Sequence, residues 1–345
     1  MDSRIVIWGS GAIGGTIGAH LARAGHPVLF VDQMEAHVDA IARDGLTLTG
    51  PISAFTVQAP AATPAAVVGR YDLVLLAVKA QDTAEAVEAI RPHLADDGAI
   101  VSIQNGLNEP VIAGIVGRER TIGAFVNFGA DWIKPGEIMY GGRGPVVVGE
   151  IDGAFTPRIT AIHQLLQDFE PEAVLTDNIF GYLWGKLAFS GILISSALTN
   201  ETLGDFFGSQ PMRPLVIAVV REILAVARAE GIWPMGFQGF EPDAFAEYDM
   251  AAIGRSMDAL VESRRHSAKL HTGFWRDLAV RKRKSEVENQ LAPIQAAARR
   301  HGLATPIVDR LRSLIEDIES GRRPLGMALA EELRAVALAS PSIAA

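Results

Sequence analysis

The sequence predicts an α/β protein in which a parallel sheet covered by helices is followed by an all-helical domain. Short β-branched runs alternate with helical patterns through the first half of the chain. From about residue 155 onward, long helical patterns dominate and strand patterns become sparse. A chain of 345 residues also exceeds what one hydrophobic core usually supports. We therefore expect two domains, residues 1–175 and 176–345.

The alternation in the first half indicates a Rossmann-type sheet, because strand–helix–strand units form parallel sheets with right-handed crossovers. The run at residues 71–78 is almost continuously apolar, as in a central strand covered on both faces. We expect three later strands, at residues 121–127, 136–140 and 145–149, to extend the same sheet. The other expected elements are strands at 4–8, 27–32 and 99–103, extended pieces at 46–49 and 55–59, and helices at 12–24, 34–43 and 84–94.

Composition excludes several functional classes. The net charge of −9 argues against binding to nucleic acid or to an anionic membrane surface. The chain has no Cys, which excludes a thiolate nucleophile and a Cys-ligated metal or iron–sulfur site, and no metal site is predicted. The first residues lack the pattern of a signal peptide, so a cytoplasmic protein is expected.

The first candidate site is the segment Gly9-Ser10-Gly11-Ala12-Ile13-Gly14, which places G-x-G-x-x-G directly between an apolar strand and a helix. Gly9 permits the tight turn, Gly11 a close approach to a pyrophosphate, and Gly14 close packing of helix on strand. The helix N-terminus also favours negative charge. The motif therefore predicts a dinucleotide site, whereas a Gly-rich turn without a ligand is the alternative.

Asp32 ends the second strand, 18 residues beyond Gly14. A carboxylate at this place can accept hydrogen bonds from ribose hydroxyls, and it would repel a 2′-phosphate. NAD(H) is therefore favoured, while Gln33 and His37 leave NADP(H) open. Asp32 could equally serve as the N-cap of the next helix.

Lys79 and Asn105 follow two successive strands of the predicted sheet. Open α/β sheets bind ligands at the carboxyl edge of their strands, so both side chains are candidates for contacts with cofactor and substrate. The alternatives are a surface Lys that opens a helix and an Asn-Gly turn.

Lys186 is the only charged residue between positions 178 and 200. This stretch approaches the length of a membrane span, but its recurrent Gly, Ser, Asn and Thr indicate a buried core helix. Burial of an ammonium lowers its pKa, which suits a general acid. Alternatively, the side chain snorkels to water. A buried Lys needs a carboxylate partner, and of Glu286 and Glu288 we prefer Glu286.

Taken together, these motifs resemble the ketopantoate reductase (2-dehydropantoate 2-reductase) family. The signature adds Trp184-Gly185-Lys186-Leu187-Ala188, Ser256-Met257 and Ser285-Glu286 to the motifs above. The resemblance implies a helical second domain like the C-terminal domain of 6-phosphogluconate dehydrogenase. It also implies that Lys186 is the general acid with Glu286 as its partner, that Lys79 and Asn105 bind cofactor and substrate, and that Ser256 contacts the substrate carboxylate.

The reaction implied is hydride transfer from a reduced nicotinamide to the C2 carbonyl of a 2-oxo acid, with Lys186 protonating the nascent alkoxide. Three features depart from the family pattern. Ser190 stands where an Asn is typical, and Ile194 or Ser195 where the next is expected, so Ser190 becomes the substrate candidate. Asp32 replaces the basic residue of NADPH-dependent members.

The third departure is an apparent insertion between Ser256 and Ser285. It contains His266, His271, Trp275, Arg276 and the basic run 281–284. Trp275 and Arg276 are candidate pocket residues, and the basic run is interpreted as a helical surface.

Four functions therefore remain open from the sequence. The first is a 2-oxo acid reductase, and the second is an NAD-dependent D-2-hydroxy acid dehydrogenase acting on branched or aromatic acids. The others are an imine- or opine-forming reductase and a non-catalytic NAD(H)-sensing protein. A homodimer formed through the helical domain is expected by analogy with the family and from the abundance of two-fold dimers.

Overall fold

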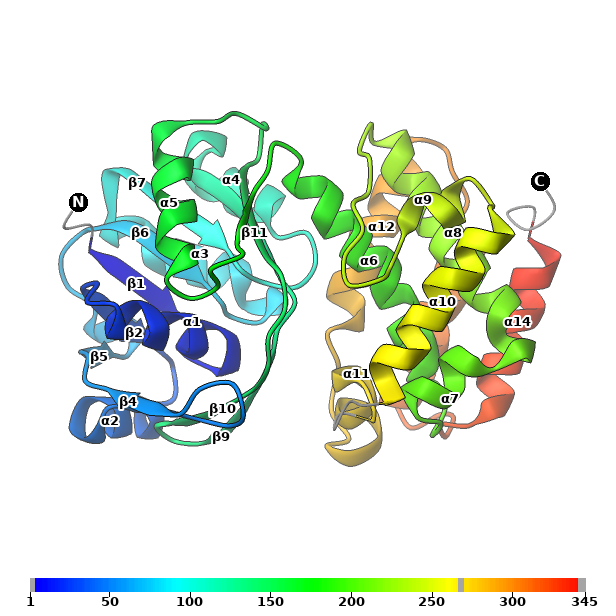
Figure 1. Cartoon of the computed structure of the whole chain (residues 1–345), viewed down its shortest axis with the longest axis horizontal. Coiled ribbons are helices and arrows are strands. Elements are labelled where there is room, and N and C mark those ends of the chain that lie inside the picture. The colour runs from blue at the N-terminus through cyan, green and yellow to red at the C-terminus, as the bar shows by residue number, and fades with distance from the viewer. Residues whose placement is uncertain (1–3, 266–269, 341–345) are drawn as a thin grey trace. The chain divides into compact units, whose positions relative to one another are not determined.

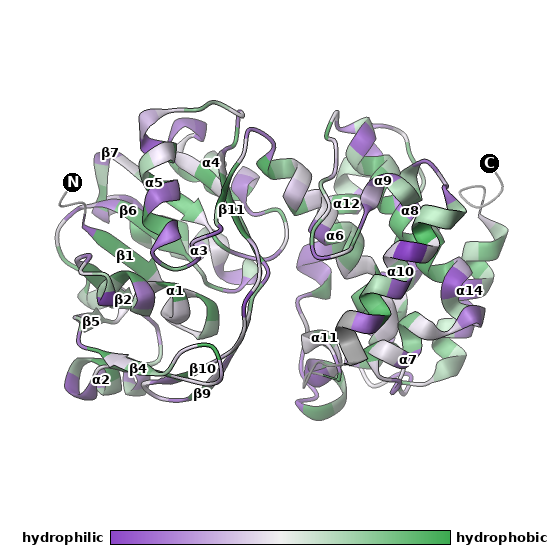
Figure 2. Cartoon of the chain, viewed as in Figure 1, coloured by the Kyte–Doolittle hydropathy of each residue, from purple (hydrophilic) through white to green (hydrophobic). Residues whose placement is uncertain are grey.

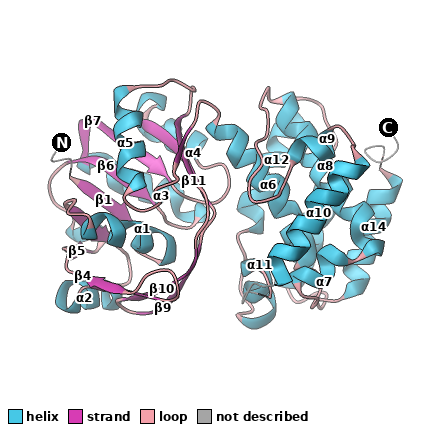
Figure 3. Cartoon of the chain, in the orientation of Figure 1, coloured by secondary structure: helices cyan, strands magenta, loops and turns pink. Residues whose placement is uncertain are grey.

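The structure, a computed structural model, describes residues 4–265 and 270–340 (Figure 1). The chain divides into two compact units, Met1–Ile179 and Phe180–Ala345. Within the described residues, every strand of the two sheets belongs to the first unit, whereas the second unit is built of helices (Figure 3). This is the predicted α/β class with a helical second domain. The expected boundary near residue 175 falls in the last strand of the first unit.

The main sheet of the first unit has eight strands in the order β12-β11-β8-β7-β6-β1-β2-β5. β5, β2, β1, β6, β7 and β8 are parallel and follow the Rossmann order, in which the topological switch point lies between β1 and β6. β11 runs antiparallel to β8. The strands are β1 (Ile5–Trp8), β2 (Val28–Val31), β5 (Ala61–Ala62), β6 (Tyr71–Leu76), β7 (Leu94–Ser102), β8 (Thr121–Val126), β11 (Val146–Glu150) and β12 (Val174–Leu175).

Both faces of this sheet are buried because the apolar runs present side chains alternately to the two sides. Ile5 and Ile7 of β1 pack into one core with α1, α5 and the second sheet, while Val6 and Trp8 pack into another with α3 and α4. The central strands are accordingly hydrophobic along their length (Figure 2). The helices are α1 (Ala12–Arg23), α2 (Glu35–Asp44), α3 (Thr83–Ile90), α4 (Glu109–Val116) and α5 (Pro157–Gln167).

The expectation that residues 136–140 extend the main sheet is wrong. Residues 137–142 form β10, which lies in a separate four-stranded sheet of order β4-β3-β10-β9. β10 pairs in parallel with β3 and antiparallel with β9, so its partners include a strand distant in sequence. The two neighbouring predictions, β8 and β11, do extend the main sheet. The bounds are β3 (Leu46–Thr49), β4 (Phe55–Val57), β9 (Gly129–Lys134) and β10 (Glu137–Gly142).

The helix expected at residues 84–94 ends early. α3 stops at Ile90, and a short 3-10 turn containing Pro92 leads into β7, which begins at Leu94 instead of residue 99. Proline has no backbone N–H and cannot continue a helix, so the turn ends the helical run.

The second unit is a set of helices that includes α6, the apolar stretch that contains Lys186. α6 is long and apolar enough to cross a membrane, but 78% of its apolar window is buried inside the protein, as in a core helix of a soluble protein. This agrees with the expected buried helix. The elements are α6 (Ile179–Ser196), α7 (Leu203–Gly208), α8 (Arg213–Ala229), α9 (Pro242–Ala246), α10 (Met250–Arg265), α11 (Gly273–Trp275), a π-helical turn (Arg276–Val280), α12 (Val287–Arg300), α13 (Pro306–Glu319) and α14 (Met327–Ala339).

Candidate active site

The glycine-rich turn connects β1 to α1, and two of its glycines are required by the backbone. Gly9 has φ +97°, and a Cβ atom there would lie 2.7 Å from the backbone nitrogen of Val78. A Cβ on Gly14 would lie 2.2 Å from the carbonyl oxygen of Gly9. Any larger residue at either place would push the turn away from the neighbouring strand.

Gly11 is different, because a Cβ there would meet no atom within 4 Å. It stands at the N-cap of α1, where no side chain caps the helix and the first turn carries no acidic residue. The backbone N–H groups at the positive end of α1, including those of Ala12 and Ile13, therefore meet neither a capping side chain nor an acidic residue of the first turn. This open cradle fits the pyrophosphate of a dinucleotide.

Ser10 contributes to the turn through its backbone rather than its side chain. Its hydroxyl is fully buried and donates to the carbonyl oxygen of Val31 on β2, at 3.1 Å. The side chain therefore holds the turn against the second strand.

Asp32 lies directly after β2 and is partly exposed. Its Oδ1 accepts a hydrogen bond from the backbone N–H of Met34 at 3.0 Å, but Met34 is the N-cap of α2, so Asp32 itself is not the cap. Glu35 adds a second carboxylate in the first turn of α2.

His37 is not available to a 2′-phosphate, contrary to the option left open by the sequence. Its side chain is 1% exposed, and both ring nitrogens are engaged with backbone groups of the first unit.

Lys79 and Asn105 come to the same edge of the main sheet. Leu76 of β6 pairs with Ser102 of β7, and each candidate lies three residues beyond its member of that pair. Both side chains are exposed, at the carboxyl end of parallel strands, on the edge to which the glycine-rich turn also belongs.

A chain of buried polar groups connects the loops that carry these two residues. Gln104 Nε2 donates to the carbonyl oxygen of Val78 and to Thr83 Oγ1, both at 2.8 Å. Thr83 Oγ1 donates to Asn108 Oδ1, and Asn108 Nδ2 donates to the carbonyl oxygen of Asn105. Sequence reasoning identified Gln104 only as part of a motif and missed Thr83 and Asn108, which have no pattern of their own.

Glu109 lies directly beyond this network, at the first position of α4. It is 1% exposed, and burial raises the pKa of its carboxyl to about 7, opposed by the backbone N–H groups at its helix start and by the Ser102 hydroxyl. Neither carboxyl oxygen has a well-formed hydrogen bond within the described residues. An acid so placed is neutral over much of the range below pH 7.

Lys186 lies in α6 between Gly185 and Leu187, both buried. Burial lowers the pKa of its ammonium to about 8, and the charge of Glu286 acts in the opposite direction by raising it. Glu286 stands immediately before α12, whereas Glu288 is in an ion pair with Arg312. Of the two carboxylates, Glu286 is thus the one whose charge acts on Lys186.

The side chains that follow Lys186 along α6 are buried. Ser190, one helical turn on, is 7% exposed, and Ile194 and Ser195 are fully buried. Ser195 Oγ donates to the carbonyl oxygen of Gly191 at 2.7 Å, so its proton is used within the helix. Of these three, Ser190 alone keeps both a polar group and some exposure.

Ser256 of α10 is 1% exposed and holds a loop. Its hydroxyl donates to the carbonyl oxygen of Gly239 at 2.8 Å and accepts from the backbone N–H of Glu241 at 3.2 Å. A substrate carboxylate needs a donor, so contact with Ser256 requires the hydrogen bond to Gly239 to be exchanged.

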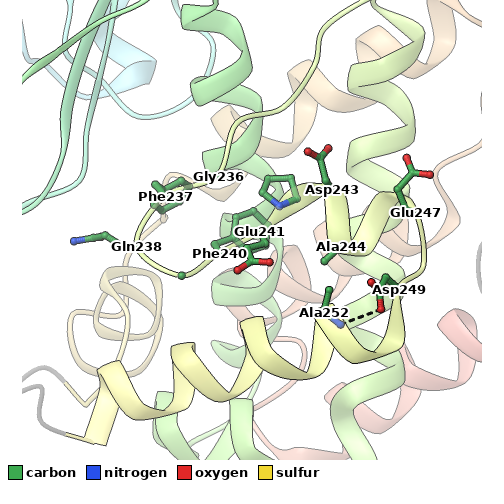
Figure 4. A pocket seen from close by; sticks show the side chains of 12 residues that line it. Gly236, Phe237, Gln238, Phe240, Glu241, Asp243, Ala244, Glu247, Asp249 and Ala252 are labelled. Atoms are coloured by element: carbon green, nitrogen blue, oxygen red, sulfur yellow. Dashed lines mark hydrogen bonds between the residues drawn. The ribbon is translucent and has the colours of Figure 1, made fainter.

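A cavity of about 640 Å³ lies beside this loop, lined by residues between positions 236 and 252 (Figure 4). Its charged side chains are all carboxylates, those of Glu241, Asp243, Glu247 and Asp249. An anionic substrate would meet like charge there, and neither Lys186 nor Glu286 lines the cavity. We therefore do not assign the reaction to it.

The segment before Glu286 differs from the expected helical surface. Arg281 and Arg283 lie in an exposed loop, and both form ion pairs with the buried carboxylate of Asp277. Trp275 stacks on His271 and donates its indole N–H to Asn200 Oδ1. Neither Trp275 nor Arg276 is among the residues that line the cavity beside Gly239. His266 lies outside the described residues.

Ser285 fixes the residue next to Glu286. Its backbone N–H and hydroxyl both donate to Glu319 Oε1, at 2.8 and 2.7 Å. Among residues 4–265 and 270–340, no three His, Asp or Glu side chains are grouped so that they could hold a metal ion.

A Rossmann sheet with an open glycine-rich cradle, together with a helical domain that carries a half-buried Lys of lowered pKa, is typical of oxidoreductases of the dinucleotide-binding class. Sequence comparison then identifies the family. The profile of ketopantoate reductase PanE/ApbA matches residues 5–153, and that of its C-terminal domain matches residues 178–319. The chain belongs to the ketopantoate reductase family.

Individual relatives cover nearly the whole chain. The 2-dehydropantoate 2-reductase of Pyrococcus abyssi is 28% identical over 324 residues, covering 92% of this chain and 98% of the relative. That of Halobacterium salinarum is 26% identical over 315 residues, covering 90% and 97%.

Solved structures of similar fold include a member of the same family. A PanE/ApbA family ketopantoate reductase from Ralstonia eutropha JMP134 superposes with a TM-score of 0.78 at 26% identity, covering 92% of this chain and 99% of that one. D-mandelate dehydrogenase with NADH and anilino(oxo)acetate gives a TM-score of 0.79 at 21% identity, covering 92% and 98%, which shows a shared fold.

Proposed function

We propose that this protein reduces the C2 carbonyl of a 2-oxo acid to a hydroxyl group, with Lys186 as general acid. The observation that carries the proposal is the charge environment of Lys186. Its side chain belongs to an apolar core helix, and burial lowers the pKa of the ammonium to about 8. The negative charge of Glu286 limits this decrease. A proton donor with a pKa near the working pH is what carbonyl reduction requires.

A reduced nicotinamide, when bound, would supply the hydride for the carbonyl carbon. As negative charge develops on the carbonyl oxygen, Lys186 stabilises it and then donates a proton from Nζ. Glu286 keeps enough of the Lys186 population protonated for this role. Asn105 and Lys79, exposed at the edge of the main sheet, are proposed to bind cofactor and substrate. Gly9 to Gly14 are proposed to hold the pyrophosphate.

NADH is the proposed cofactor. Between residues 32 and 39 the charged side chains are Asp32, Glu35 and Asp39, with no Lys or Arg. A 2′-phosphate near Asp32 would meet two carboxylates at the start of α2, since Glu35 lies in its first turn. We expect NADPH to bind more weakly.

The proposed substrates are ketopantoate or another branched or aromatic 2-oxo acid. Ser190 replaces the amide expected from the family pattern, and the positions one turn further are fully buried. Loss of those polar contacts favours a second candidate function, an NAD-dependent D-2-hydroxy acid dehydrogenase. In either case we propose that Ser190 contacts the substrate. We also propose that Ser256 can exchange its hydrogen bond to the Gly239 carbonyl for one to the substrate.

The experiment is to follow oxidation of NADH and NADPH with ketopantoate and with a panel of branched and aromatic 2-oxo acids. Preferred turnover of ketopantoate supports a place in pantothenate biosynthesis. Preference for another acid with NADH supports the D-2-hydroxy acid dehydrogenase. Binding of both cofactors with no turnover of any acid would overturn the proposal in favour of a nucleotide sensor.

We further propose that two copies assemble through the helical unit, and that the protein works in the cytoplasm. Light scattering of the purified protein measures the first, and a constant monomeric mass at all concentrations would contradict it.

A further inference from the structure

His37 connects two segments that are distant in the sequence of the first unit. Its Nε2 lies 2.9 Å from the carbonyl oxygen of Ser10 in the glycine-rich turn. Its Nδ1 accepts a hydrogen bond, also of 2.9 Å, from the backbone N–H of Gly136, in the turn between β9 and β10. The side chain is 1% exposed, so both contacts are shielded from water.

These two contacts define the protonation of the ring. A backbone N–H can only donate, so Nδ1 must carry a lone pair. A carbonyl oxygen can only accept, so Nε2 must carry the proton. The hydrogen-bond pattern therefore assigns the neutral Nε2–H tautomer.

The anchored carbonyl belongs to the peptide that connects Ser10 to Gly11. None of the described peptide bonds is cis, and in a planar trans peptide the C=O and N–H point in opposite directions. Holding the Ser10 carbonyl on His37 therefore directs the Gly11 N–H away from His37. Gly11 is the N-cap of α1, where a Cβ would meet only open space.

We propose that His37 is a positioning residue for the dinucleotide, which orients the Ser10–Gly11 peptide so that the Gly11 N–H can donate to the pyrophosphate. The inference rests on the proposed function in one respect only, that the ligand is a dinucleotide. It also gives the four-stranded sheet a role, because the Gly136 turn fixes the other side of the ring.

Two variants separate the two contacts. His37→Gln can place an amide N–H near the position of Nε2 and keep the bond to Ser10. His37→Asn has a shorter side chain whose oxygen can replace only Nδ1 and keep the bond to Gly136. His163→Gln is the matched control, since His163 also binds a backbone carbonyl, that of Ala173, at 2.8 Å in the first unit.

Affinity for NADH is measured by fluorescence titration of the full chain, without substrate. We expect near wild-type affinity for His37→Gln and His163→Gln, and an affinity about five- to tenfold lower for His37→Asn, as for loss of one hydrogen bond. With substrate, His37→Asn should raise the KM for NADH and leave kcat at saturating NADH unchanged. Equal affinities of the two His37 variants would overturn the inference.

The outcomes distinguish this inference from the proposed function. If the wild type binds NADH but reduces no acid, the proposed function fails while the variants still test His37. If the wild type binds neither NADH nor NADPH, both fail. Nitrogen-15 NMR of the wild-type histidines provides a test that needs no folded variant, because a protonated Nδ1 on His37 at neutral pH contradicts the assigned tautomer.

Discussion

The ammonium of Lys186 should govern how the reaction depends on pH. Its pKa is lowered from 10.5 to about 8, so it is charged at pH 7 and neutral at pH 9. As general acid it must be charged for reduction and neutral for oxidation of the product. We expect the rate of reduction to fall about tenfold per pH unit above pH 8, and the rate of oxidation to rise up to that pH. Rate profiles between pH 6 and pH 10 in both directions measure this.

Replacement of Glu286 tests the origin of that pKa. Glu286 raises the pKa of Lys186, so Glu286→Gln should lower it and move the decline of the reduction rate to lower pH. Glu288→Gln is the matched control because Glu288 pairs with Arg312. A profile unchanged in Glu286→Gln would show that Glu286 does not act on the proton donor.

Sequence reasoning reached the residues whose roles depend on local pattern. The glycines between β1 and α1 and the isolated charge at Lys186 are visible in the order of residues alone. The bonds of His37 and Ser256 are not, because their partners Gly136 and Gly239 are placed beside them only by the fold. A buried His or Ser that holds a backbone has no characteristic spacing.

At the scale of the element, Glu109 at the start of α4 makes the free energy of unfolding depend on pH. The pKa of Glu109 is raised from 4.5 to about 7 in the folded protein. Its contribution to stability is therefore fully present below pH 4.5 and lost as the pH rises through about 7. The shift corresponds to about 3 kcal/mol as an upper limit.

Glu109→Gln removes that charge, so it should increase the free energy of unfolding at pH 8 by about 1–3 kcal/mol relative to its effect at pH 5. Urea unfolding at the two pH values measures the difference. The variant still contains Glu222, whose pKa is also raised to about 7 by burial, so its stability should still depend partly on pH. An equal effect of the substitution at both pH values would contradict burial of a charge.

Helix α6 approaches the backbone of residue 235 at Gly185. A Cβ there would lie 2.1 Å from the carbonyl oxygen of Met235, so Gly185→Ala should lower the free energy of unfolding by about 1–3 kcal/mol. Gly254→Ala in α10 is the matched control, because its Cβ would meet nothing within 4 Å. Because Ala favours the helix more than Gly does, Gly254→Ala should raise the free energy of unfolding by about 0.5–1 kcal/mol. Similar effects of both substitutions in thermal unfolding would contradict the close contact.

Elements with strong local patterns could be predicted, and so could the parallel main sheet, whereas the sheet to which β10 belongs could not. The apolar runs of β1, β2 and β6 are confirmed as strands, because burial on both faces leaves a continuous signal. β10 has an ordinary strand pattern, and nothing in it shows that it pairs with β3 rather than β11. Strand pairing depends on which surfaces the rest of the chain leaves uncovered.

At the scale of the whole molecule, the two-domain organisation of the family agrees with the change from alternating strand and helix patterns to helical patterns along the chain. Among the described residues, both sheets lie in the first unit and the second unit is helical, as the sequence indicates. The chain passes from β12 to α6 with no Gly- or Pro-rich linker, since residues 176–178 are Thr, Asp and Asn. Composition alone therefore does not mark the boundary, because a short polar connection is no different from any other loop.

The central claim, that Lys186 donates the proton in a 2-oxo acid reduction, is tested most directly by comparing wild type with Lys186→Ala. The measurement is the initial rate of NADH oxidation with the best 2-oxo acid, with NADH affinity determined in parallel. Lys134→Ala serves as control, because Lys134 is exposed and pairs with Glu137 on the surface. We predict a loss of kcat of about 100-fold or more in Lys186→Ala, with NADH affinity and the control unchanged. Wild-type turnover in Lys186→Ala would contradict the mechanism.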